Sequence, residues 1–114
     1  MADCIFCQIA TGKIPSEKIF ENERVLAFRD LHPQAPTHVL VIPRRHIATL
    51  NDLQSNDAAL VGEMMLAATQ IAAKENLAEA GYRLVMNCNQ HGGQSVYHIH
   101  LHLLGGRYMK WPPG

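Results

Sequence analysis

Residues 97–104 read Tyr97-His98-Ile99-His100-Leu101-His102-Leu103-Leu104, with three of the chain's seven histidines at every second position. In a β-strand successive side chains point to opposite faces, so the histidines would share one face and Ile99, Leu101 and Leu103 the other. A helix would rotate each histidine about 200° from the one before it, so the alternation favours a strand. This segment therefore predicts a strand that buries one face and offers three imidazoles on the other.

The composition of the 114 residues indicates one soluble globular domain, spanning residues 1–114. Ten basic and ten acidic residues cancel, which argues against a nucleic-acid partner or a membrane surface held by bulk charge. No apolar run is long enough to cross a bilayer, and no secretory signal pattern opens the chain. Three cysteines, an odd number, fit a reducing compartment better than a disulfide framework. We therefore expect a cytoplasmic protein.

The remaining elements predict an α+β fold with about five antiparallel strands. Leu60, Met64 and Ile71 recur at helical spacing and predict one long helix over residues 57–76. Residues 38–42 are almost all apolar, which suggests a central strand covered on both faces. Further strands are expected at 18–21, 24–29 and 83–87, a short N-terminal helix at 3–10 capped by Asp3, and a polar loop at 89–95. Clustered strands with short connections favour an antiparallel sheet over alternating βαβ units.

Three imidazoles on one strand face admit three interpretations. A solvated polar face that happens to use histidine is the first, although perfect alternation argues against it. A metal site is the second, because neutral imidazole is a common ligand of zinc, copper and iron. Nucleophilic or acid–base catalysis is the third, because an unprotonated imidazole can attack phosphorus or an acyl carbon. The strand by itself does not choose between metal and nucleophile.

Several segments extend the pattern beyond the three histidines. These are Gly93-Gln94-Ser95-Val96 before them, Gly105-Gly106-Arg107 and Trp111-Pro112-Pro113-Gly114 after them, and Ile14-Pro15-Ser16, Ala27-Phe28-Arg29-Asp30, Pro33-Gln34-Ala35-Pro36-Thr37-His38 and Val41-Ile42-Pro43 with His46 upstream. Together these segments resemble the Hint branch of the histidine triad (HIT) superfamily. Its signature is His-φ-His-φ-His-φ-φ, where φ is apolar. The resemblance covers almost the whole chain.

The resemblance implies a HIT-like fold in which two protomers join their five-stranded sheets into one ten-stranded sheet. It implies a homodimeric hydrolase of purine nucleoside phosphoramidates and related adenylates, which releases a nucleoside monophosphate through a covalent nucleotidyl-histidine. No cofactor is required for this chemistry. Residues 107–114 are expected to form a C-terminal tail near the active site.

The resemblance also implies catalytic roles for five residues. His100 would be the nucleophile that attacks the α-phosphorus, and His102 would contact the phosphate or the leaving group. Ser95 would form a hydrogen bond near the departing amine. His98 and His46 would support the site or relay protons.

A second set of residues is implied to bind the nucleotide. Asp30 would hold the ribose hydroxyls, because a carboxylate accepts two hydrogen bonds, and Asn87 would bind oxygens on the phosphate side. The other expected contacts are Phe28, Leu31, Ile9 and Ile42 around the base, Gln94 and Val96 near the phosphate, and Trp111 in the tail.

Cys4-Ile5-Phe6-Cys7 forms a C-x-x-C pair, which is half of a zinc site if two further ligands converge on it. Some members of the superfamily bind zinc through such a pair with histidines at the places of His46 and His98, and this chain has all four residues. Two reduced, buried thiols on a short helix are the alternative. A metal here would be structural, because His100 must remain free.

Two other functions stay open from the sequence. One is a zinc-binding or regulatory interaction protein on the same fold, and the other is a dinucleoside polyphosphate hydrolase. Two isolated histidines are interpreted without catalysis: His38 is expected to make a structural hydrogen bond, and His91 to be exposed to solvent.

Overall fold

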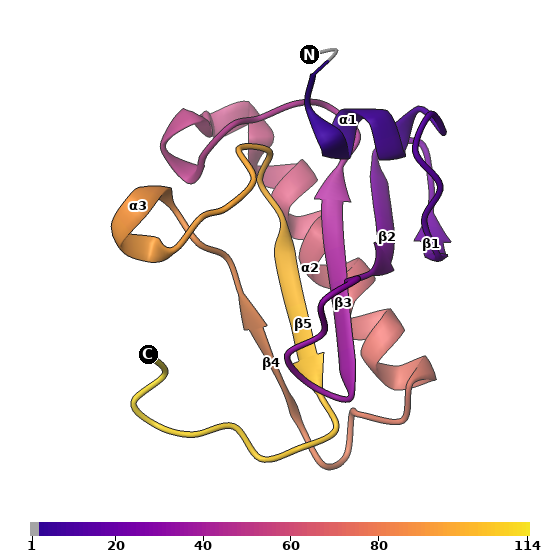
Figure 1. The fold of residues 1–114 in the computed structure, drawn as a ribbon, viewed down its shortest axis with the longest axis vertical. Coiled ribbons are helices and arrows are strands. Elements are labelled where there is room, and N and C mark those ends of the chain that lie inside the picture. The colour runs from indigo at the N-terminus through magenta and orange to yellow at the C-terminus, as the bar shows by residue number, and fades with distance from the viewer. Residues whose placement is uncertain (1–2) are drawn as a thin grey trace.

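The sheet is organised around β3 (Thr37–Pro43), whose residues from His38 onward are all buried. In the computed structural model, which describes residues 3–114, the strands lie in the order β1-β2-β3-β5-β4, and every neighbouring pair is antiparallel (Figure 1). The other strands are β1 (Lys18–Glu21), β2 (Val25–Arg29), β4 (Tyr82–Val85) and β5 (Leu101–Gly105). The α+β class and the five-stranded antiparallel sheet expected from the sequence are confirmed.

Helices lie on both faces of this sheet. The long helix α2 (Ala58–Lys74) packs its apolar stripe on one face, against Val39, Val41 and Leu103. The short helix α1 (Ile5–Ala10) lies on the opposite face, where Phe6 and its neighbours pack on β2 and β3. Two 3-10 turns, η1 (Leu50–Asp52) and η2 (Ser55–Asp57), lead into α2, and α3 (Asn89–Gly92) precedes β5. Among residues 3–114 there is no helix with the length and apolar character needed to cross a membrane.

The histidine segment divides between the two sides as the alternation predicts. Ile99, Leu101 and Leu103 belong to the core beneath α2. The rings of His98 and His100 contact Phe6 of α1 on the other side. The segment thus separates an apolar face beneath α2 from a histidine face on the α1 side, where His98 and His100 are themselves buried.

The predicted length of this strand is wrong, because only residues from Leu101 onward belong to β5. Its neighbour β3 pairs Val41 with Leu101 and ends at Pro43, which has no N–H group to continue the ladder. Before Leu101 the chain leaves the sheet, and the Ile99 N–H donates to the carbonyl oxygen of Ile47 at 2.8 Å. His98 and His100 are therefore held by loop contacts, whereas His102 sits in the strand.

Two smaller expectations are also corrected. Helix α1 is capped by Cys4 rather than Asp3, because the extended backbone of Cys4 lets its Sγ accept the Cys7 N–H at 3.4 Å. The expected loop at 89–95 contains the single turn α3, which is terminated by Gly93 at φ 81°.

Candidate active site

A cavity of 330 Å³ opens on the α1 side of the sheet and brings together residues from distant parts of the chain. Its apolar wall comes from α1, β2 and β3, with Phe6, Ile9 and Phe28 among its members. Its polar edge contains His100 and His102. A mainly apolar cavity with a few convergent polar groups is the usual form of a small-molecule site.

His100 is held as a neutral imidazole with a defined tautomer. Its Nδ1 lies 2.8 Å from the carbonyl oxygen of His98, and a carbonyl only accepts, so Nδ1 carries the proton. Burial lowers the pKa of His100, so the ring is unprotonated at neutral pH. The lone pair is therefore on Nε2, as a nucleophile requires.

His102 is held in the opposite tautomer by a chain of hydrogen bonds. The backbone N–H of Gln34 donates to Nδ1 of His38 at 3.0 Å, so His38 carries its proton on Nε2. That Nε2 lies 2.9 Å from Nδ1 of His102, which must then accept. His102 consequently carries its own proton on Nε2 and can donate it as a hydrogen bond to a ligand.

Burial is the main cause that lowers the pKa of His102 to about 4, and the neighbouring His100 and His38 lower it further, while Asp30 opposes the shift. Burial also lowers the pKa of His38, although the carboxylate of Asp30 lies 3.4 Å from its Nε2. The cluster therefore pairs one imidazole that offers a lone pair, His100, with one that offers an N–H, His102. Both are neutral at pH 7.

His38 is the residue whose part in this site the sequence interpretation did not recognise. The expected hydrogen bond exists, but its partner is His102 rather than a purely structural group. The signal was present in the strand pairing: Leu40 pairs with His102, so His38, two residues before Leu40, lies on the same face of the sheet. Finding it required the β3–β5 register.

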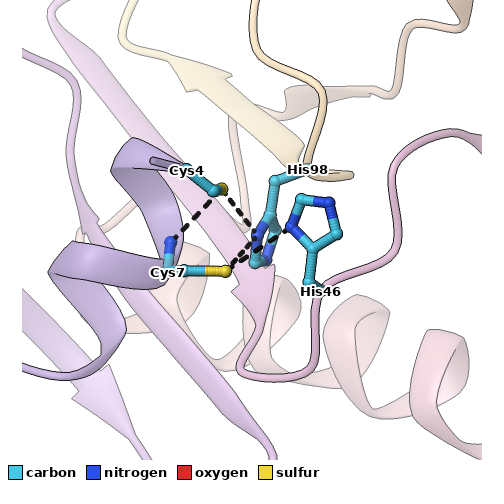
Figure 2. A group of neighbouring side chains, drawn as sticks. All are labelled: Cys4, Cys7, His46 and His98. Carbon is cyan, nitrogen blue, oxygen red and sulfur yellow. Dashed lines mark hydrogen bonds between the residues drawn. The ribbon is translucent and has the colours of Figure 1, made fainter. Parts of the chain in front are cut away.

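A second cluster lies beside the first and joins Cys4, Cys7, His46 and His98 (Figure 2). Nδ1 of His98 is 3.4 Å from Sγ of Cys4 and 3.6 Å from Sγ of Cys7, and Nδ1 of His46 is 3.5 Å from Sγ of Cys7. One ligand atom from each residue lies within 4.8 Å of all the others. Burial raises the pKa of the Cys7 thiol, and the neighbouring Cys4 raises it further.

These four residues fit a tetrahedral zinc ion. With Zn–S near 2.3 Å and Zn–N near 2.05 Å, tetrahedral angles separate a sulfur from a nitrogen ligand by about 3.6 Å. Three of the four sulfur–nitrogen distances in the cluster are 3.4 to 3.6 Å. His98 also points Nε2 at the carbonyl oxygen of Pro43 at 2.8 Å, which leaves the lone pair of Nδ1 toward the sulfurs. The cluster could therefore hold such a metal.

Comparison with known proteins gives one consistent family. Residues 3–111 match the family model described as "Scavenger mRNA decapping enzyme C-term binding". The chain is 51% identical over 105 residues to the purine nucleoside phosphoramidase of Escherichia coli K12, covering 92% of this chain and 88% of that protein. A HIT family hydrolase from Legionella pneumophila Philadelphia 1 is 57% identical, with a TM-score of 0.97 and coverage of 98% of this chain and 100% of that chain.

The chain belongs to the HIT family. A histidine triad protein from Clostridium difficile is a further similar structure, 42% identical with a TM-score of 0.94 and 96% coverage of both chains. The relationship expected from the sequence is confirmed, and this HIT protein is a homologue of hydrolytic enzymes.

The cavity of the HIT protein contains eight of the residues expected at the site. They are Ile9, Phe28, Asp30, Leu31, Ser95, Val96, His100 and His102. It also contains residues that the sequence interpretation did not single out, above all Phe6 of α1. Phe6 lies three residues before Ile9, and that helical spacing was the available signal for a shared face.

The other expected site residues do not line this cavity. Ile42 is buried in the cluster that supports Phe28, and His46 and His98 lie in the cysteine–histidine cluster. The side chain of Gln94 accepts from the Asn89 N–H at 2.9 Å and donates to the carbonyl oxygen of Ala48 at 2.7 Å, so it braces a loop. Asn87 and Trp111 are also outside the lining. Trp111 is 82% exposed, and the guanidinium carbon of Arg83 in β4 lies over its ring, 5.9 Å from the centroid.

Proposed function

We propose that this protein hydrolyses the P–N bond of purine nucleoside phosphoramidates and related adenylates. The observation that carries the proposal is the pair of opposite imidazole tautomers in one cavity: a lone pair on Nε2 of His100 and an N–H on Nε2 of His102. The 51% identity to a purine nucleoside phosphoramidase supports the choice of substrate class.

In the first step, Nε2 of His100 attacks the α-phosphorus, the P–N bond breaks, and the electron pair leaves with the amine. The amine needs a proton to leave, and this proton comes from solvent and is relayed by the hydroxyl of Ser95, while the neutral His102 keeps its own proton. In the second step, water attacks the nucleotidyl-histidine, the P–N bond breaks with its electron pair returning to Nε2 of His100, and the nucleoside monophosphate is released. The proton lost by the water returns to solvent, which balances the proton taken up by the amine. The N–H of His102 donates a hydrogen bond to the phosphoryl oxygens as charge develops on them.

The rest of the cavity suits a purine nucleotide. Phe28 and Ile9 form an apolar wall for the base, with Leu31 at the exposed rim. Asp30 lines the same cavity, and its carboxylate would accept hydrogen bonds from the ribose hydroxyls. Backbone amides near Val96 would bind the phosphate side, while Gln94 holds that loop in place.

The substrate test compares an adenosine phosphoramidate with a diadenosine polyphosphate under the same conditions. We expect AMP release from the phosphoramidate to be faster in kcat/KM by more than tenfold. Preference for the polyphosphate would instead establish the dinucleoside polyphosphate hydrolase, and no turnover of either would leave a binding protein on the HIT fold. Free thiols at Cys4, Cys7 and Cys88 suit the reducing cytoplasm as its location.

We expect His38→Leu to lower kcat by about 10²-fold with a smaller change in KM, because His102 loses the donor that holds its proton on Nε2. His38→Asn keeps a side-chain N–H donor and should retain part of the activity. Steady-state kinetics of both variants provides the measurement. Equal losses in the two variants would show that the ring of His38, and not its hydrogen bond, is what matters.

A homodimer would complete the ten-stranded sheet. Strand β4 lies at the edge of the sheet, and the outer side of α2 exposes Met65 and Leu66, which are 42% and 62% accessible. Two chains paired along β4 would cover these apolar side chains and bring residues 107–114, which lie beside β4, close to the partner. Trp111 of the tail and Asn87 lie outside the cavity of their own chain. In the dimer, both would then contribute to an active site.

Light scattering after gel filtration should give the mass of two chains, and Leu66→Glu should shift it to one chain, because a buried charge at the interface is costly. Lys18→Glu serves as the control and should stay dimeric, because Lys18 is exposed and lies on β1 at the opposite edge of the sheet. A single-chain mass for the unaltered protein would contradict the dimer.

The same proposal includes a structural zinc ion held by Cys4, Cys7, His46 and His98. When bound, it would supply a cross-link between α1 and the histidine segment, and none of the steps at His100 passes through it. We expect protein purified without chelator to contain about one zinc per chain, and the double variant Cys4→Ser, Cys7→Ser to lose it, as measured by metal mass spectrometry. Cys88→Ser is the matched control. Equal metal content in the double variant would remove the thiols from the site.

A further inference from the structure

Helix α1 is shared by the catalytic cavity and the cysteine–histidine cluster. Its residues Ile5, Phe6 and Ile9 line the cavity, while Cys7 and the capping residue Cys4 belong to the cluster. A helix of six residues is not stable in isolation, so its position depends on its tertiary contacts. Whatever strengthens or weakens the contacts of the cluster therefore acts on one wall of the cavity.

Phe6 links the two sites through direct ring contacts. Its centroid lies 5.1 Å from that of His100 and 5.8 Å from that of His98, both close to perpendicular. On the cavity wall it meets Phe28 edge-on at 5.5 Å. A displacement of α1 would thus move Phe6 against the nucleophile and against the base-binding wall together.

His98 supplies a second link, through the backbone. Its side chain faces the sulfurs of Cys4 and Cys7, and its carbonyl oxygen accepts a hydrogen bond from Nδ1–H of His100. His98, which faces the cysteines of α1 (Figure 2), is therefore also the residue that sets the tautomer and direction of His100.

We infer that the cysteine–histidine cluster couples metal binding to nucleotide binding by fixing the position of α1. We call this coupling the clasp. Without a metal, α1 is attached to the histidine segment by thiol–imidazole hydrogen bonds, which are weak, and by apolar packing. With zinc on the four ligands, α1 is held in its position at the cavity wall. A nucleoside monophosphate then binds more tightly than it does to the zinc-free protein. By linkage, the nucleotide strengthens zinc binding by the same factor. This inference rests on the proposed nucleotide site.

The experiment measures both halves of that linkage on the unaltered chain. The dissociation constant of AMP is determined by calorimetry for zinc-loaded and chelator-stripped protein, and that of zinc by chelator competition with and without saturating AMP. We expect the two ratios to agree and to lie on the order of 5- to 100-fold. Amide hydrogen exchange in α1 should slow when zinc is added, with no substrate turnover involved.

Variants locate the coupling. Cys88 is a free thiol outside the cluster. In Cys88→Ser, the ratio of the AMP dissociation constants of stripped and zinc-loaded protein should equal that of the parent. Cys4→Ser, Cys7→Ser should bind AMP like the stripped parent, whether or not zinc is present. Phe6→Leu keeps an apolar side chain and the zinc ligands but loses the ring contacts. The ratio of its AMP dissociation constants without and with zinc should therefore fall toward one.

The outcomes separate the inference from the function on which it rests. Equal AMP affinity for the loaded and stripped forms would overturn the clasp and leave the nucleotide site intact. Failure to bind zinc at micromolar concentration would overturn it as well. If neither form binds AMP, the proposed function fails, and the clasp fails with it. The comparison of zinc-loaded with zinc-stripped parent uses the unaltered chain, so it does not depend on whether any variant folds.

Discussion

Replacing His100 by alanine should lower the rate of AMP release from an adenosine phosphoramidate on the order of 10⁴-fold or more, as removal of a catalytic nucleophile does in other enzymes. The variant keeps the apolar cavity and His102, but no other group offers a neutral lone pair in the same position. His102 is not a substitute, because its Nδ1 is occupied by His38 and its Nε2 carries the proton. Steady-state release of AMP gives the rate.

Intact-mass spectrometry at neutral pH adds a second readout, because the parent should accumulate a nucleotidyl adduct and His100→Ala should not. The matched control is His91→Ala, an exposed histidine in α3 outside the cavity, which should keep the parent rate. Activity of His100→Ala within tenfold of the parent would assign the nucleophile to another residue.

Leu103→Ala should lower the free energy of unfolding by about 2–5 kcal/mol, the usual cost of truncating a buried leucine. Leu103 is completely buried, lies between Val39 and Leu84 in the sheet, and packs in the core beneath α2. The removed methyl groups leave a cavity that rigid neighbours on two strands and a helix do not fill. Urea unfolding followed by circular dichroism measures the change.

Leu31→Ala is the control for that measurement, because Leu31 is 88% exposed and should change the free energy of unfolding by less than about 0.5 kcal/mol. A loss below 1 kcal/mol for Leu103→Ala would mean that the alternate residues of the histidine segment are not the buried ones. The whole assignment of faces in β5 would then be in error.

Much of the fold could be predicted because its signals are local. The stripe of Leu60, Met64 and Ile71 marks α2, since a helix with one buried side repeats its apolar residues every 3.6 positions. The continuous apolar run of β3 is central because helices cover both of its faces. The end of the histidine strand was predicted less well, because where a ladder stops depends on its neighbour, here at Pro43 of β3.

Contacts between residues distant in the sequence account for those features of the site that could not be predicted. Phe6 reaches His100 only because α1 folds over β2 and β3. The bond between His38 and His102 joins residues 64 positions apart, and that between Cys4 and His98 joins residues 94 positions apart. No local pattern specifies such distances.

The sequence by itself determined that three histidines alternate with core residues, that the fold is α+β, and which residue types are available for chemistry. It did so because alternation and helical spacing record which side of each element is buried. Only the tertiary structure decided which ring nitrogen of each imidazole carries the proton. The carbonyl oxygen of His98 places the proton on Nδ1 of His100. Groups from distant parts of the chain place it on Nε2 of His102, through His38 and the Gln34 N–H, and on Nε2 of His98, through the carbonyl oxygen of Pro43. The tautomer of a histidine is set by its partners, and the partners are brought to it by the fold.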